Sequence, residues 1–296
     1  DKIIVYENSP ITQAFPALVV NFLRHTPFYI WVQDLWPDAM KSGGGIKNQY
    51  ILNFIDRFVK LVYNKSTKIM ISSKGFYDLI KAKGNYEKKM VYLPNWSDDV
   101  LLMEKKQIPK LPEGYIIMMT GNLGTAQRLD VIMRAVVDLK DLEEIKWVFV
   151  GDGSRKQWLD NFINENKLEK TVFALGRYSF DFIPAFLSSA DVLLLTLKAE
   201  FPHLKAVVPS RLQTYLAAGK PILAMIDGGA AEIIKESDCG YCVDAEDYLA
   251  FEETIRNKVL PFKEDFALKG QKGRYYYEEK FTKEKGITDL ISIIYS

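Results

Sequence analysis

Apolar residues occur along this chain mostly as short runs that alternate with longer segments of helical periodicity. Apolar runs of four to six residues predict buried strands, and the segments between them predict helices. In the first hundred residues the strands are expected at Ile3–Tyr6, Phe28–Gln33, Lys68–Ser72 and Met90–Leu93. Helices are expected at Ile11–Leu23, Ile46–Tyr63 and Lys74–Lys83. Such alternation is typical of parallel α/β layers.

The pattern breaks at Met103–Gly114, where charged residues and two prolines predict a linker. A second set of strands follows, at Tyr115–Thr120, Lys146–Val150, Val172–Leu175, Val192–Thr196, Ile222–Ile226 and Tyr241–Val243. Helices at Phe266–Phe281 and Lys283–Tyr295 close the chain. We therefore predict an α/β protein with two doubly wound parallel sheets, in domains 1–105 and 115–281, that face a cleft where ligands sit.

The first domain is expected to be incomplete, because the chain opens at Asp1 directly before an apolar strand. The closing helix, at about 282–296, is expected to pack back onto this domain.

Within the first domain, the helix predicted over Asn48–Tyr63 is apolar over most of its circumference and carries Arg57 and Lys60. We expect this helix to be covered on both sides by its own domain. The alternative is a surface that touches a membrane or a lipid-linked substrate.

The bulk composition excludes several classes of protein. The 296 residues contain 39 basic and 38 acidic side chains, so the chain has almost no net charge and no general electrostatic attraction for nucleic acid. They show neither the pattern of a signal peptide nor an apolar run long enough to span a membrane, so we expect neither. Two cysteines in this length indicate a reducing, cytoplasmic compartment. Cys239 and Cys242 form a C-x-x-C pair, but a zinc site would need further ligands and His25 and His203 are the only histidines.

The stretch at residues 207–223 predicts a phosphate-binding helix start. Ser210 is a candidate N-cap for a helix over Arg211–Ala218, and Gly219 stands where a left-handed C-terminal cap belongs. Free amides and the positive end of the helix dipole attract a phosphate, and the Arg211 guanidinium adds matching donors. A capped surface helix with a solvated arginine would show the same pattern.

Glycine-rich loops follow three strands of the second domain. Gly121, Asn122, Leu123 and Gly124 follow the first strand and are expected to open a helix, where backbone amides can approach an anion. Gly151 and Gly153 repeat this arrangement after the next strand, and Gly176 with Arg177 ends the third. The spacing matches neither a dinucleotide fingerprint nor a P-loop. Tight β-to-α turns without a ligand are the alternative.

In the first domain, Gln33, Asp34 and Trp36 follow a strand, and Asn95 follows another. Asp34 would therefore lie at a strand's carboxyl end, where a carboxylate can accept a hydroxyl proton or orient a sugar. Capping of the turn that begins near Pro37 explains Asp34 equally well.

Several motifs together resemble the retaining glycosyltransferases of family 4, which have the GT-B fold. They are GNLGTAQRLD at 121–130, GDG at 151–153, FALG at 173–176, PSRLQTYLAAGKPIL at 209–223 and DCGYCV at 238–243. QDLWPD at 33–38 and LPNWSD at 93–98 resemble the branch of that family that acts in capsule, O-antigen and exopolysaccharide assembly.

The resemblance implies transfer of a sugar from a nucleotide donor, often UDP-linked, with retention of configuration and without a metal or other cofactor. The acceptor would be a glycan or a polyprenyl-diphosphate-linked sugar, reached at the inner face of the membrane. The diphosphate would rest on the amides of residues 122–124 and 210–211 and on Arg211, with the nucleoside near Gly176, Arg177 and Thr214. The acceptor would approach Asp34 and Trp36, with Gln33 and Asn95 beside them.

The sequence also departs from the family pattern. A Glu-x7-Glu pair found in many members is replaced by Ala206 and Thr214. The basic residues that often bind the diphosphate correspond to Asn122 and Gln127, and the usual cleft histidine corresponds to Gln33. Two other functions therefore stay open, a non-catalytic nucleotide-sugar-binding partner and a sugar-nucleotide epimerase of the same architecture.

Overall fold

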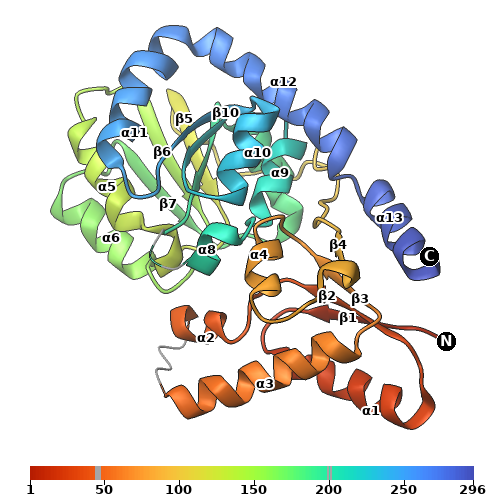
Figure 1. The fold of residues 1–296 in the computed structure, drawn as a ribbon. Helices are drawn as coiled ribbons and strands as arrows, with labels where there is room; N and C mark the ends of the chain where they lie inside the picture. Colours follow the sequence, from red (N-terminus) through yellow and green to blue (C-terminus); the bar gives the residue numbers. More distant parts are fainter. Residues whose placement is uncertain (44–47, 199, 201) are drawn as a thin grey trace. The chain divides into compact units, whose positions relative to one another are not determined.

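The computed structural model describes residues 1–43, 48–198, 200 and 202–296, and these form two compact units. Unit 1 comprises Asp1–Asn95, residues 202–208 and Lys283–Ser296, and unit 2 comprises Trp96–Glu200 and Pro209–Thr282. Each unit is built on one parallel sheet (Figure 1). No sequence signal had indicated that residues 202–208 belong to unit 1. The segment 103–114, predicted as a linker, contains no helix or strand.

Unit 1 contains a four-stranded sheet in the order β1-β2-β3-β4. Its strands are β1 (Ile3–Glu7), β2 (Phe28–Val32), β3 (Lys68–Ile71) and β4 (Met90–Tyr92). Its helices are α1 (Phe15–Arg24), α2 (Asp38–Gly43), α3 (Gln49–Lys65), α4 (Phe76–Lys81), α8 (Pro202–Ala206) and α13 (Lys283–Tyr295), with short 3-10 turns at Ile11–Ala14 and Glu87–Lys89. All five residues of β2 are buried, as expected for a parallel strand covered on both faces.

Alternation along β2 assigns the helices of unit 1 to the two faces of the sheet. Phe28, Ile30 and Val32 lie in one core with side chains of α1 and α3, which run along the same face (Figure 1). Tyr29 points to the other face, where its hydroxyl donates to the Ile294 carbonyl of α13 at 2.9 Å. The predicted start of a helix at Ile46 and Lys47 lies outside the described residues; α3 begins after Asn48, whose side chain accepts from the amides of residues 50 and 51.

Unit 2 contains a six-stranded parallel sheet in the order β10-β9-β8-β5-β6-β7. Its strands are β5 (Tyr115–Thr120), β6 (Ile145–Val150), β7 (Val172–Gly176), β8 (Val192–Thr196), β9 (Ile222–Met225) and β10 (Gly240–Val243). Its helices are α5 (Leu129–Asp138), α6 (Lys156–Glu165), α7 (Ile183–Ser189), α9 (Arg211–Ala217), α10 (Gly229–Ser237), α11 (Tyr248–Thr254) and α12 (Lys263–Lys280). Short 3-10 turns at Thr125–Gln127, Phe180–Phe182 and Leu260–Phe262 and a π-helical turn at Ile255–Val259 complete the unit.

This strand order is that of a Rossmann-like sheet. The chain proceeds outward from β5 through β6 and β7, and then returns to build β8, β9 and β10 on the other side. The order therefore reverses between β5 and β8, and ligands of such sheets bind beyond the strand ends at that point. The predicted doubly wound α/β class is confirmed for unit 2, and unit 1 is likewise a parallel α/β layer.

Candidate functional site

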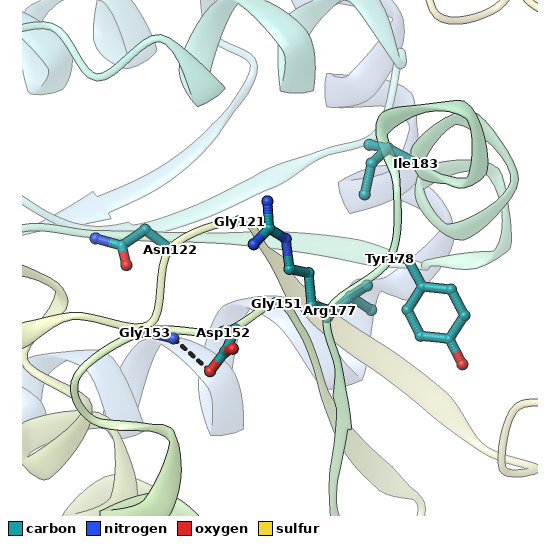
Figure 2. Close-up of a pocket in the computed structure, with 9 residues that line it drawn as sticks. Gly121, Asn122, Gly151, Asp152, Gly153, Arg177, Tyr178 and Ile183 are labelled. Carbon is teal, nitrogen blue, oxygen red and sulfur yellow. Dashed lines mark hydrogen bonds between the residues drawn. The ribbon is translucent and has the colours of Figure 1, made fainter.

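Three neighbouring strands of unit 2 end around one cavity of about 460 Å³. It is lined by Gly121 and Asn122 after β5, by Val150–Gly153 around the end of β6, and by Arg177, Tyr178 and Ile183 after β7 (Figure 2). The sequence had placed its glycine loops at these strand ends, and the structure brings all three together. A volume of this size is typical of pockets for small molecules.

The first two loops are packed so closely that one position must be glycine. A Cβ atom at Gly151 would lie 1.8 Å from the Gly121 carbonyl oxygen, which is backbone and cannot turn away. The Gly151 amide donates to Gly176 at 2.8 Å, and the Gly121 amide donates to Val150 at 2.8 Å. The floor of the cavity is therefore a fixed backbone surface.

Two of the three amides of the 122–124 loop that were expected to hold an anion are already used by the protein. The Leu123 amide donates to the Asp152 carbonyl at 2.9 Å, and the Gly124 amide donates to the Gln127 side chain at 3.0 Å. The helix expected after this loop is present as α5, with Leu129, Ile132 and Val136 buried. A 3-10 turn and a left-handed Arg128 come between Gly124 and α5. Of residues 122–124, only the Asn122 amide has no acceptor within the described part of the chain.

Two further predicted donor contacts also serve the fold. Gln127 is buried and caps the 121–124 loop through its side-chain oxygen, while its carbonyl accepts from the Thr196 hydroxyl at 2.6 Å. The Thr214 hydroxyl lies 3.0 Å from that of Ser97. Both side chains are therefore engaged within unit 2.

Arg211 is the first residue of α9 and reaches back to the β5 loop. One terminal guanidinium nitrogen, Nη2, donates to the Asn122 carbonyl at 3.1 Å. The other, Nη1, is buried without a hydrogen-bond partner among the described residues. A buried donor left unpaired costs free energy comparable to a lost hydrogen bond, so its presence indicates a missing acceptor.

The prediction that Ser210 caps the helix beginning at Arg211 is wrong. Ser210 has helical backbone angles and its side chain makes no capping hydrogen bond, because the preceding residues already turn and the Leu212 amide donates to Pro209. The predicted left-handed conformation of Gly219 is confirmed, with φ at 66°. The charge at this helix start therefore comes from the arginine itself and not from a serine-capped dipole.

Arg177 and Tyr178 leave the end of β7 in different directions (Figure 2). The exposed Arg177 side chain extends toward Gly121 and forms no ion pair within the described residues. The Tyr178 ring packs edge-on against Phe186, with centroids 4.8 Å apart, so it completes the wall. Arg177 and Arg211 place two cationic side chains at this edge of the sheet, beside the Asp152 carboxylate, which accepts from the Gly153 amide at 2.7 Å.

The polar residues predicted in unit 1 also lie near one another, at the ends of β1, β2 and β4. The Asn95 amide donates to the Gln33 side-chain oxygen at 2.6 Å, and the Ser9 hydroxyl donates to Asp34 at 2.8 Å. Asp34 is half-buried, so its carboxylate is accessible. Trp36 was expected to meet an acceptor, but its side chain is only 9% exposed and packs in the core of unit 1.

Glu7 belongs to this group and was missed. It ends β1, its side chain is fully buried, and its backbone carbonyl accepts from the Gln33 amide at 2.9 Å. Neither carboxyl oxygen has a partner of hydrogen-bonding geometry in the described residues. Burial, and secondly the charge of Asp34, raise the pKa of Glu7 to about 10. Glu7 is therefore a neutral acid at pH 7. The sequence signal that could have identified it was a single glutamate at the end of an apolar strand.

Other candidate features of the sequence carry no chemistry in this structure. Cys239 and Cys242 are free thiols, and burial raises the pKa of each to about 11. Within the described ranges, no group of three His, Cys, Asp or Glu side chains could hold a metal ion. Ala206, one of the two positions at which the resemblance leads us to expect a glutamate, is buried in the core of unit 1 against Gly75. None of the described helices is both long and apolar enough to cross a membrane.

Comparison with known proteins identifies the family. The model of the family described as glycosyl transferases group 1 matches residues 103–260, more than half of the chain. A probable glycosyltransferase of Pseudomonas aeruginosa, WbjE, is 27% identical over 259 residues, which cover 81% of this chain and 63% of that protein. The alpha-monoglucosyldiacylglycerol synthase of Acholeplasma laidlawii is 24% identical over 64% of this chain and 46% of its own. The chain thus spans less than two thirds of the length of these relatives.

Solved structures share the fold at low sequence identity. HepE of Anabaena, in complex with UDP and glucose, superimposes with a TM-score of 0.78 over the whole of this chain and 78% of its own, at 15% identity. TarM of Staphylococcus aureus, in a complex that includes UDP, gives 0.66 over 96% of this chain and 54% of its own, at 16% identity. Two parallel α/β units and these likenesses establish the GT-B fold. The chain belongs to the group 1 glycosyl transferases.

Proposed function

We propose that this protein transfers a sugar from a UDP-linked donor to a glycan or polyprenyl-diphosphate-linked acceptor, with retention at the anomeric carbon. The observation that carries the proposal is the buried, unpartnered Nη1 of Arg211 beside the 121–124 loop. An anionic oxygen would satisfy that nitrogen, and arginine matches phosphate geometry. The complexes of HepE and TarM with UDP support a nucleotide of this kind.

The donor would occupy the strand-end cavity of unit 2. Its diphosphate would take hydrogen bonds from Arg211 and the Asn122 amide, and Arg177 would add charge from the cavity wall. The nucleoside would lie along Gly176 and Arg177. Two cationic side chains would stabilise the departing diphosphate as its charge grows, which is the interaction that lowers the barrier.

Retention follows if the acceptor hydroxyl attacks the face that the diphosphate leaves. The bond from the acceptor oxygen to the anomeric carbon forms while the bond to the phosphate oxygen breaks, and the hydroxyl proton passes to the departing diphosphate. No protein nucleophile and no metal is required in this scheme, since guanidinium groups supply the positive charge. Asp34, with Gln33 and Asn95, would orient the acceptor.

We further propose that the protein acts in surface-polysaccharide assembly at the cytoplasmic face of a membrane. The motifs at 33–38 and 93–98 support the role in surface-polysaccharide assembly. A polyprenyl-linked acceptor is held at a membrane, and one relative is named for the synthesis of a glucosylated diacylglycerol. The two free thiols suit a reducing compartment.

A panel of nucleotide sugars, incubated with the full-length protein with and without lipid-linked acceptor, tests the proposal. We expect free nucleotide to be released with one donor and only when the acceptor is present. Binding without turnover would indicate a nucleotide-sugar-binding partner. An altered sugar formed without acceptor would indicate an epimerase, and either result would overturn the transferase assignment.

A further inference from the structure

Two central strands of the unit 2 sheet separate before they end. β5 pairs with β6 along its whole length, but it pairs with β8 only at Ile117 and Met118. The Gly121 amide donates to Val150 on the β6 side, so the amide of the residue before it, Thr120, faces the β8 side. Thr120 is buried and lies beyond the last pair with β8. Its amide therefore needs an acceptor other than a neighbouring strand.

The acceptor is the hydroxyl of Tyr215, a residue of α9. The Thr120 amide donates to this hydroxyl at 2.9 Å, and the Thr120 hydroxyl lies 3.4 Å from the same oxygen. The Tyr215 side chain is fully buried. Tyr215 thus replaces the missing ladder bond between β5 and β8, at the point where the strand order reverses.

Arg211 lies one helical turn before Tyr215 and contacts the next two residues of the β5 segment. Side chains four positions apart share one face of a helix. The Arg211 guanidinium lies over Gly121, where a Cβ atom would be 3.4 Å from Nη2, and Nη2 donates to the Asn122 carbonyl at 3.1 Å. One face of α9 therefore holds three consecutive residues at the end of β5.

The other end of α9 is fixed by α12. Arg274 of α12 donates to the Ala217 carbonyl at 2.8 Å. Gly270 packs so closely that a Cβ atom there would lie 2.2 Å from the Gly219 carbonyl oxygen. A seven-residue helix has little stability of its own, so its orientation is set by such contacts. With the carboxyl end held by α12, the amino end with Arg211 is oriented by the contacts to β5.

We infer that the Tyr215 hydroxyl is a positioning group for Arg211. It keeps α9 in register with the end of β5, so that the unpaired Nη1 of Arg211 lies where the donor diphosphate is proposed to bind. The inference rests on the proposed function, because Tyr215 acts through Arg211 and touches no substrate. Without the hydroxyl, the buried Thr120 amide loses its acceptor and the start of α9 is free to shift. A displacement of about 1 Å is enough to spoil the alignment of a binding group.

A double-mutant cycle on UDP binding, measured by calorimetry with the full-length protein, tests the inference. Tyr215→Phe keeps the ring and removes the hydroxyl, and we expect it to weaken UDP binding about 10-fold. In the Arg211→Ala background the same substitution should weaken binding less than about 2-fold, because the arginine that it positions is absent. Tyr29→Phe is the matched control. It removes another buried hydroxyl bond, to the Ile294 carbonyl in unit 1, and should bind UDP like the wild type.

A structure of the wild-type protein with UDP gives a second test that needs no variant. The hydrogen bond between Tyr215 and Thr120 should persist while Nη1 of Arg211 contacts the diphosphate. A complex in which that contact forms after α9 has moved away from β5 would overturn the inference.

The outcomes separate this inference from the proposed function. An equal loss of UDP affinity on Tyr215→Phe in both backgrounds, or no loss in either, would overturn the inference alone. An Arg211→Ala variant that binds UDP like the wild type would overturn both. Coupled losses of UDP affinity without sugar transfer to any acceptor would support the inference and overturn the transferase assignment.

Discussion

The two sheets end in polar clusters of opposite character. In unit 2, the Leu123 and Gly124 amides bond within the loops, while the Asn122 amide and Nη1 of Arg211 have no acceptor among the described residues.

In unit 1, the buried polar atoms without a partner among the described residues are both carboxyl oxygens of Glu7, next to the carboxylate of Asp34, together with Nε2 of Gln33 and Nε1 of Trp36. The unit 2 cluster thus leaves a cationic donor unpaired, whereas the unit 1 cluster leaves a neutral acid and two neutral donors unpaired. This difference teaches that a buried charged group without a partner points to a ligand of opposite charge, and of the two clusters only that of unit 2 has such a group.

Removal of Arg211 should have the largest effect, because it deletes the unpaired donor that defines the unit 2 cluster. We expect Arg211→Ala to lower kcat about 100- to 1000-fold, as loss of a donor to a developing negative charge does. Steady-state kinetics with the identified donor measures this. Arg134→Ala, at an exposed arginine of α5 that bonds to Tyr248, is the matched control. Equal turnover in both variants would contradict the assignment.

The buried acid of unit 1 should make stability depend on pH. The folded protein keeps the Glu7 proton up to a pKa of about 10, whereas an unfolded chain loses it above about 4.5. Between pH 4.5 and pH 10 the native state therefore binds more protons than the unfolded state. In that range, Glu7 makes the free energy of unfolding fall by about 1.4 kcal/mol for each unit by which the pH rises.

Denaturant unfolding at pH 6, 7 and 8 checks this slope. The isosteric variant Glu7→Gln should lack it and should therefore gain on the wild type as pH rises. Glu165→Gln, at an exposed glutamate of α6, should keep the wild-type slope. Parallel slopes for wild type and Glu7→Gln would show that Glu7 is already ionised in the folded protein.

The role of Asp34 should appear in turnover and not in donor affinity. Asp34→Asn keeps the shape and removes the charge, and we expect kcat to fall about 10-fold while the KM for the donor stays unchanged. Ser9→Ala, which removes the hydroxyl that donates to Asp34, should cost less. A pure loss of donor affinity would move Asp34 out of the acceptor side.

Chelation should have the smallest effect, since arginines and not a metal are proposed to stabilise the diphosphate. We expect turnover in excess EDTA to match turnover in added magnesium. A loss in EDTA that magnesium restores would refute the metal-free scheme.

Short apolar runs were enough to locate the strands, because the central strands such as β2, β8 and β9 are buried along their whole length. All ten predicted strands are present, with ends shifted by a residue or so. The glycine loops were also located, because their backbone must approach another backbone, as at Gly151. Helix ends were harder to predict. Ser210 has the right residue type for a cap, but the preceding turn already satisfies the helix start.

Residues whose role depends on distant neighbours escaped prediction. Trp36 looked like a surface aromatic, yet its burial is decided by the packing of the core of unit 1. Glu7 looked like an ordinary strand end, and only the fold reveals that its carboxyl is sealed from water beside Asp34. The outer side of α3 follows the same rule, because periodicity shows that a face is apolar but not what covers it. Tyr50 and Phe54 are 88% and 71% exposed, so the expectation that this helix is covered on both sides by its own domain is wrong for the residues described.

A crystal structure of the full-length protein with UDP bound tests the central claim most directly. We predict a diphosphate oxygen at hydrogen-bonding distance, about 3 Å, from Nη1 of Arg211, with the nucleoside in the cavity beyond β5, β6 and β7. A diphosphate bound elsewhere, with Nη1 still unpaired, would contradict the account.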